Sequence, residues 1–193
     1  MKKITLILAG IISIALLATS CKTREKAEPV SKVTGDVEVA IPFTGKEYRS
    51  DDNYFRGTNN GKSMDMSTAK KMAMLNAQRD IAQAVQVLLK SVSDQYTNQK
   101  QISDVQEFEQ KFNDYTRTVA QQTMNDVRVM DEKVFKGSDG KFTYYVALEM
   151  PKDAVAKAMA DKLSKDAKTQ LDFDEYQFKK IFDEEMKKFE EGR

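Results

Sequence analysis

Residues 56–63, RGTNNGKS, contain a glycine followed by lysine and serine, the residue types that hold phosphate groups in a P-loop. A P-loop also needs an earlier glycine, separated from this Gly-Lys-Ser by four residues, so that successive backbone N–H groups surround the phosphates. Arg56 occupies that place, and Gly57 lies one position too late. The polar residues before the segment are also unlike the buried strand that leads into a P-loop. We therefore predict a flexible polar loop over residues 44–66 and no nucleotide site.

Two adjacent carboxylates, Asp51 and Asp52, lie in the same predicted loop. Carboxylates can carry out acid–base hydrolysis when their surroundings move one pKa toward neutrality. The neighbouring residues offer no apolar surroundings of that kind, and adjacent acids in a polar loop are usually solvated. A carboxylate-dependent hydrolase is therefore the alternative function, to be preferred only if either aspartate is buried opposite another carboxylate in a cleft.

Aromatic and arginine side chains are concentrated in this loop, and such a mixture favours recognition of a ligand or partner. The candidates are Tyr48, Arg49, Tyr54, Phe55 and Arg56. The alternative is that Tyr54 and Phe55 turn under the sheet and hold the loop in place. Their exposure to solvent distinguishes the two interpretations.

The composition excludes several classes of chemistry. The chain has no His and one Cys, which rules out zinc sites, Cys–His nucleophiles and redox pairs of cysteines. Four methionines could offer thioether ligands to copper, but methionines more commonly fill cores. These are Met64, Met66, Met72 and Met74. We therefore predict no metal and no cofactor, and the net charge of +1 lacks the basic excess of a nucleic-acid-binding protein.

The first residues have the form of a bacterial secretory signal. MKK is a positively charged start, ITLILAGIISIALL is an apolar segment, and ATSC ends it with small residues. Cys21 lies where a bacterial lipoprotein is cleaved and acylated, and LLATSC resembles the lipobox, with Ala18 where leucine is commonest. An ordinary secretory signal with an incidental cysteine is the alternative.

Acylation of Cys21 would hold the protein on a membrane more firmly than one acyl chain could. In bacterial lipoprotein sorting, a residue other than Asp after the cysteine favours the outer membrane, and here that residue is Lys22. We predict a signal peptide over residues 1–20 and a flexible tether over 21–34. We expect the domain to be lipid-anchored to the outer membrane and to face the periplasm.

The remaining sequence predicts an α+β domain over residues 35–168 and a C-terminal helix over 169–193. Alternating apolar residues predict a first strand over 37–43, and helical spacing predicts a long helix from Ser67. A second helix follows SDVQ, where Ser103 and Gln106 fit a capping box. Alternation returns on both sides of Asp139-Gly140, which predicts a hairpin, and a helix follows it. The order β-α-α-β-β-α predicts a three-stranded, mainly antiparallel sheet with helices on one face and a helical C-terminal extension.

The C-terminal helix is predicted to begin at Asp174, a residue type that caps helices well. Its apolar stripe is too large to stay exposed on a soluble monomer. The stripe consists of Phe178, Ile181, Phe182, Met186 and Phe189. It packs either on its own domain, which the short connection to the preceding helix favours, or on a partner, another copy included. The oligomeric state itself is not predicted.

The long helix and the hairpin together resemble the lipoprotein-twenty family of small bacterial envelope lipoproteins. The resemblance covers residues 37–160 and rests on Ala69, Ala73 and Ala77 before Ile81-Ala82, and on the aromatic hairpin that enters a helix. It implies a compact β-α-β-β domain of the kind found in envelope and flagellar accessory proteins, and it supplies no catalytic residues. We therefore expect a non-enzymatic envelope lipoprotein that binds or organises another envelope component, a protein or a glycan. A carboxylate-dependent envelope hydrolase remains the alternative.

Overall fold

The computed structural model describes residues 39–191 of the chain. The predicted signal peptide, Cys21 and the predicted tether lie outside these residues. One compact unit begins at Ala40 and includes the C-terminal helix. Over the described residues, no helix is both long and apolar enough to cross a membrane.

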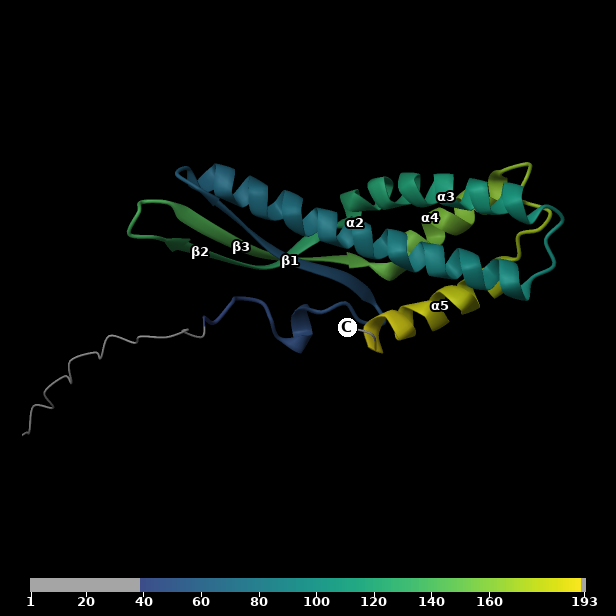
Figure 1. Ribbon diagram of the computed structural model, residues 1–193, viewed down its shortest axis with the longest axis horizontal. Coiled ribbons are helices and arrows are strands. Elements are labelled where there is room, and N and C mark those ends of the chain that lie inside the picture. The colour runs from purple at the N-terminus through teal and green to yellow at the C-terminus, as the bar shows by residue number, and fades with distance from the viewer. Residues whose placement is uncertain (1–38, 192–193) are drawn as a thin grey trace, which may run out of the picture. The chain divides into compact units, whose positions relative to one another are not determined.

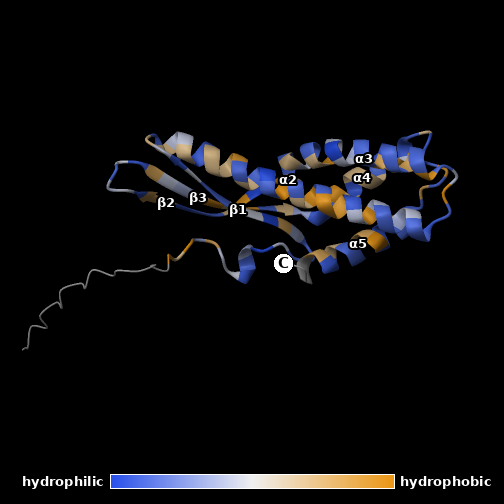
Figure 2. Cartoon of the chain, viewed as in Figure 1, coloured by the Kyte–Doolittle hydropathy of each residue, from blue (hydrophilic) through white to orange (hydrophobic). Residues whose placement is uncertain are grey.

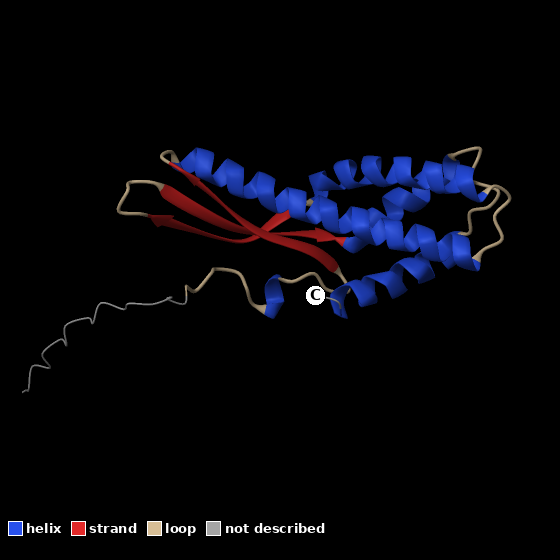
Figure 3. Cartoon of the chain, viewed as in Figure 1, coloured by secondary structure: helices blue, strands red, loops and turns tan. Residues whose placement is uncertain are grey.

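The compact unit is an α+β domain with a three-stranded antiparallel sheet in the order β1-β3-β2, as the sequence predicts (Figure 1). Its sheet lies toward one end, and helices make up the other (Figure 3). The strands are β1 (Tyr54–Ser63), β2 (Arg128–Lys136) and β3 (Phe142–Pro151). The helices are α2 (Met66–Gln99), α3 (Val105–Gln122), α4 (Lys152–Lys165) and α5 (Glu175–Glu191), with short 3-10 turns η1 (Lys46–Tyr48) and η2 (Thr123–Asp126).

The first strand is not where the apolar alternation placed it. The described part of the predicted strand, residues 39–43, is not a strand, and Val39 and Ile41 are 75% and 60% exposed. The strand is instead β1, so the prediction of a flexible loop over residues 44–66 is wrong. β1 pairs along its whole length with β3, from Tyr54 opposite Pro151 to Ser63 opposite Phe142.

The glycines of β1 explain why it lacks the usual apolar pattern. Every second residue of β1 faces α2, and at Gly57 and Gly61 the helix backbone comes so close that a Cβ atom would collide with it. The small residues Ala69, Ala73 and Ala77 form the facing side of α2 and are fully buried. Sheet and helix therefore meet through small residues, with little room for large apolar side chains.

Helix α2 continues beyond the sheet and becomes the centre of the helical end. Asp65 caps its start, accepting a hydrogen bond from Thr68 N at 2.7 Å. Its buried stripe continues from Ile81 to Tyr96 and meets α3 and α5. Figure 2 shows apolar residues along α2 where it lies beside α5.

Helices α3 and α5 close this core. The cap of α3 is Asp104, which accepts a hydrogen bond from Glu107 N at 2.9 Å, so the predicted capping box at Ser103 is wrong by one residue. The predicted cap of α5 is confirmed, since Asp174 accepts from Gln177 N at 3.0 Å. Four of the five stripe residues of α5 are buried in the domain's own core, and Phe189 packs against it. Packing on the own domain is therefore confirmed.

Candidate functional site

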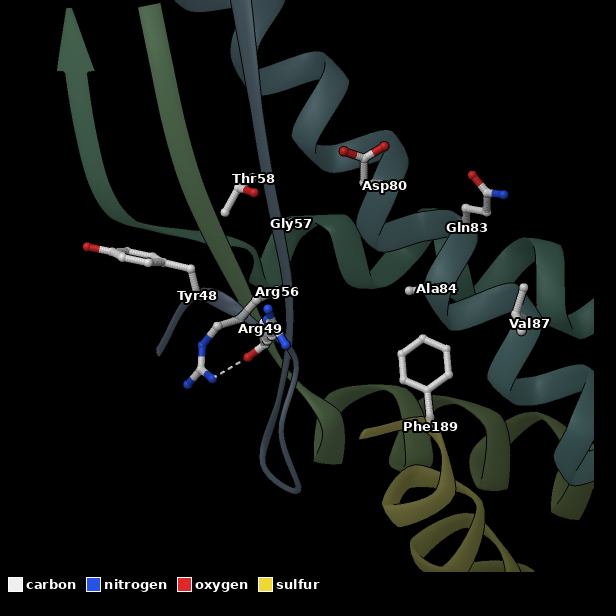
Figure 4. Close-up of a pocket in the computed structure, with 10 residues that line it drawn as sticks. All are labelled: Tyr48, Arg49, Arg56, Gly57, Thr58, Asp80, Gln83, Ala84, Val87 and Phe189. Atoms are coloured by element: carbon white, nitrogen blue, oxygen red, sulfur yellow. Dashed lines mark hydrogen bonds between the residues drawn. The ribbon is translucent and has the colours of Figure 1, made fainter. Parts of the chain in front are cut away.

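A groove of about 540 Å³ lies beside β1, on the edge that does not pair with β3 (Figure 4). We call it the edge groove. Strand β1 forms one side, α2 forms the other, and Phe189 of α5 points in from the end of the groove. It is lined by Tyr48, Arg49, Arg56, Gly57, Thr58, Asp80, Gln83, Ala84, Val87 and Phe189.

At each end of this groove, other groups of the same chain form hydrogen bonds with the outward-facing backbone of β1. At one end, Arg56 N donates to Ser50 Oγ at 2.9 Å, and Tyr54 O accepts from Asp51 N at 3.0 Å. At the other end, Asn60 O accepts from Asn76 Nδ2 at 3.0 Å. These bonds show that the even-numbered residues of β1 direct their backbone groups outward.

Thr58 lies between these two covered stretches. Because alternate residues of an antiparallel strand direct their N–H and C=O to the same side, Thr58 directs both groups into the edge groove. No group among residues 39–191 hydrogen-bonds to either of them. The backbone groups of Lys62, further along the strand, have the same direction and also lack a partner among the described residues, but Lys62 does not line the groove. An open strand edge is normally covered or blunted, so Thr58, the open residue at the wall of the groove, is a candidate binding element.

Residues 40–53, which we call the strap, run across the outer face of the sheet and form one wall of the edge groove. Tyr48 Oη donates to Asp131 Oδ2 of β2 at 3.0 Å, and the Phe43 ring lies 5.0 Å from the Tyr48 ring and under Lys133 Nζ at 5.5 Å. Phe43 has φ of +63°, a conformation that bulky residues rarely adopt. The strap is therefore fixed to the sheet at several points.

Arg56 is held in an ion network on the same outer face. Its guanidinium contacts Asp51 Oδ2 at 2.5 Å and Glu149 Oε2 at 3.3 Å, and Glu149 also binds Arg128 Nε at 2.8 Å. The Tyr54 ring lies beside both guanidinium groups, 5.3 Å from that of Arg56 and 5.2 Å from that of Arg128. The charge of Arg56 is therefore already matched within the chain.

Arg49 and Asp80 supply the charges that are left for a ligand. Arg49 is exposed, and its side chain has no ion-pair or hydrogen-bond partner among residues 39–191. Asp80 accepts a hydrogen bond from Asn59 Nδ2 at 2.9 Å and has no cationic partner in the same residues. Ala84 and Val87 line the same groove, and Val87 is 54% exposed although it is apolar.

The predicted patch of five loop residues is divided by the structure. Tyr48, Arg49 and Arg56 come together in the edge groove. Phe55 is completely buried, which confirms the alternative that it holds the segment in place, and Tyr54 lies on the outer face. Sequence reasoning missed the contribution of α2, where an apolar Val87 on the otherwise polar side of the helix was the available signal.

The two aspartates do not form the arrangement that would favour a hydrolase. Neither Asp51 nor Asp52 lines the edge groove. Burial acts to raise the pKa of Asp51, but hydrogen bonds from Asn53 N, Arg56 and Tyr54 N outweigh it and lower that pKa. Asp51 therefore stays a carboxylate that holds the turn and Arg56. Within residues 39–191, no three metal-binding side chains lie together.

Comparison of the chain with protein-family models, curated proteins and solved structures gave no match. The functional proposal therefore rests on the chemistry of the sequence and on the geometry of the edge groove.

Proposed function

We propose that this protein is a non-enzymatic envelope lipoprotein that binds another envelope component, a protein or a glycan, in the edge groove. Acyl groups on Cys21 hold it to the outer membrane, and the domain faces the periplasm. The resemblance of LLATSC to the lipobox supports the anchor. Membership of the lipoprotein-twenty family belongs to the same proposal. The order of strand, long helix, hairpin and helix supports it, while the inserted helix α3 and the C-terminal helix α5 go beyond the minimal pattern of that family.

The observation that carries the binding proposal is the open backbone of Thr58. The chain covers the neighbouring backbone groups of β1 with Ser50, Asp51 and Asn76, yet leaves Thr58 open at the wall of a groove. Arg49 and Asp80 add two charges without ionic partners among the described residues. Backbone groups, charges and an exposed apolar side chain together form the few convergent contacts that orient a ligand.

The anchor is tested by replacing Cys21 with Ala. The variant should incorporate no labelled palmitate, and it should leave the membrane fraction or remain as the uncleaved precursor. Recovery of a processed protein that still requires detergent for extraction would show that Cys21 is not the anchor.

Binding in the groove is tested with a photo-reactive amino acid placed at Val87 in living cells. Val105 on α3 is the matched control, because it is an exposed valine that lies outside the groove. We expect a discrete cross-linked product from position 87 and none from position 105. Equal products from both positions, or none from either, would contradict the groove as the binding site.

A further inference from the structure

The open part of the β1 edge that lines the groove is short, and its length limits what can bind there. Toward the start of β1, the strap occupies the edge through Ser50 and Asp51. Toward the end of β1, the side-chain amide of Asn76 donates a hydrogen bond to Asn60 O. A long added strand would have to displace both, whereas a short one fits between them.

In an antiparallel pair, a residue exchanges both its N–H···O bonds with the single residue opposite. Thr58 can therefore pair with one ligand residue, and each neighbour of that residue extends about 3.4 Å further along the edge. An extended peptide of three residues would then span the open backbone.

The two charges lie at opposite ends of this stretch. Arg49 is beside Arg56, whose Nη1 donates to Arg49 O at 2.7 Å, and Asp80 is beside Asn59. Arg56 and Asn59 are three residues apart in a strand, or about 10 Å. The ends of an extended tripeptide are separated by a similar length. Its carboxylate at Arg49 and its amino group at Asp80 would make it run antiparallel to β1.

The pairing also determines where the ligand's side chains point. Thr58 is on the outer face of the sheet, so the middle side chain of the peptide points outward, and the first and third point toward α2. The third lies beside Gly57, which has no side chain, and close to the apolar wall formed by Ala84, Val87 and Phe189. An apolar third residue is therefore favoured.

From these contacts we propose that the edge groove binds a free tripeptide, extended and antiparallel to β1, with an apolar third residue. The proposal rests on the proposed binding function and gives its ligand a chemical class. Recognition is through the middle residue's backbone and both charged termini.

The probe is the free tripeptide Ala-Ala-Leu, titrated calorimetrically into the full-length protein in detergent. We expect saturable binding, weakened roughly tenfold or more by Arg49→Gln, because a charge-assisted bond is lost. Lys46→Gln is the matched control: Lys46 is another exposed cation of the strap, outside the groove, and its removal should leave binding unchanged. The C-terminal amide should bind the native protein weakly, and Arg49→Gln should no longer distinguish acid from amide.

Methylation of the peptide nitrogens tests the backbone pairing without altering the protein. An N-methyl group on the middle residue removes the N–H that faces Thr58 and should abolish binding. One on the third residue, whose N–H faces away from β1, should be tolerated.

Three results would overturn the proposal. If the peptide blocked at both ends binds as well as the free one, the groove recognises a strand within a longer chain. If no tripeptide binds while position 87 still gives its cross-linked product, the tripeptide is wrong and the proposed function stands. If no tripeptide binds and position 87 gives no cross-linked product, the proposed binding function is wrong as well.

Discussion

Replacing Gly61 with Ala should destabilise the domain, because β1 and α2 touch at this glycine. A Cβ atom there would overlap the Ala69 carbonyl oxygen and lie 2.6 Å from Met72 Cβ and 2.7 Å from Ala73 N. Two of these three atoms belong to the helix backbone, which cannot move aside as a side chain can. The strand and the helix would have to separate.

Overpacking of this kind typically costs about 1–3 kcal/mol, and more where backbone must move. Replacing glycine by alanine also restricts the unfolded chain, which offsets about 0.4–1 kcal/mol. Because helix backbone must move here, we take a gross cost of about 3–4 kcal/mol, which leaves a net loss of about 2–3 kcal/mol in the free energy of unfolding. For a domain of this size, about 2–4 °C of melting temperature per kcal/mol gives a decrease of about 4–12 °C.

Gly137 in the β2–β3 turn supplies the matched control. A Cβ atom there would meet the carboxylate of Asp139 at 2.6 Å, with its next neighbours at 3.6 and 3.7 Å. That carboxylate is the end of a flexible side chain, so Gly137→Ala should change the melting temperature little. Thermal and urea unfolding of both variants check the prediction. If Gly61→Ala melts with the native protein, the close contact of β1 and α2 is not the reason for glycine.

Two further predictions concern the helical end. Phe182→Ala should cost about 3–5 kcal/mol, as for other buried phenylalanines, while Lys180→Ala on the exposed side of α5 should cost little. Unchanged melting of Phe182→Ala together with lost self-association in sedimentation would show that the stripe serves a partner instead. Burial, together with the bond to Asp166 at 2.5 Å, raises the pKa of Tyr115 from 10.0 to about 12. Because the folded state favours the neutral phenol, its contribution is complete below pH 10.0 and is lost as pH rises toward 12. Stability measured by urea unfolding should therefore fall more steeply in this range for the native protein than for Tyr115→Phe, and equal slopes would contradict the assignment.

The elements that the sequence predicted well are those whose apolar residues face a core. The hairpin has strong alternation in β3 and a glycine at its turn, Gly140, with φ of +77°. The stripe of α5 has helical spacing and a capping Asp174. In β3 and α5, most of the residues that carry the pattern are buried, whereas Val129, Val134 and Phe135 of β2 are exposed.

Strand β1 could not be recognised in this way, because its contact with α2 is made by glycines. The missing side chains are the structural signal, but periodicity measures only the side chains that are present. Val39 and Ile41, by contrast, alternate like a strand although both are exposed. The apolar alternation therefore predicts the first strand in the wrong segment, and the sequence of β1 has the composition of a loop.

The sequence predicts only some of the residues of the edge groove, and the reason is related. Its arginines and tyrosine are concentrated in one segment, where composition indicates recognition. Asp80 and Val87 come from α2, and Phe189 from α5, so their proximity to Thr58 depends on the register of β1 against the helix. That register follows from contacts at Gly57 and Gly61, which the sequence pattern did not reveal.

Helix α2 has a consequence for how the domain opens. Its 34 residues correspond to about 51 Å, whereas the ten-residue strand β1 extends about 34 Å. One continuous helix therefore serves as the wall of the sheet at one end and as the centre of the helical core at the other. The two ends should then unfold as a single cooperative unit, and amides in the middle of α2 should exchange with deuterium only through global opening. A change at Gly61 and a change at Phe182 would accelerate exchange at the same amides, although they lie at different ends of the domain.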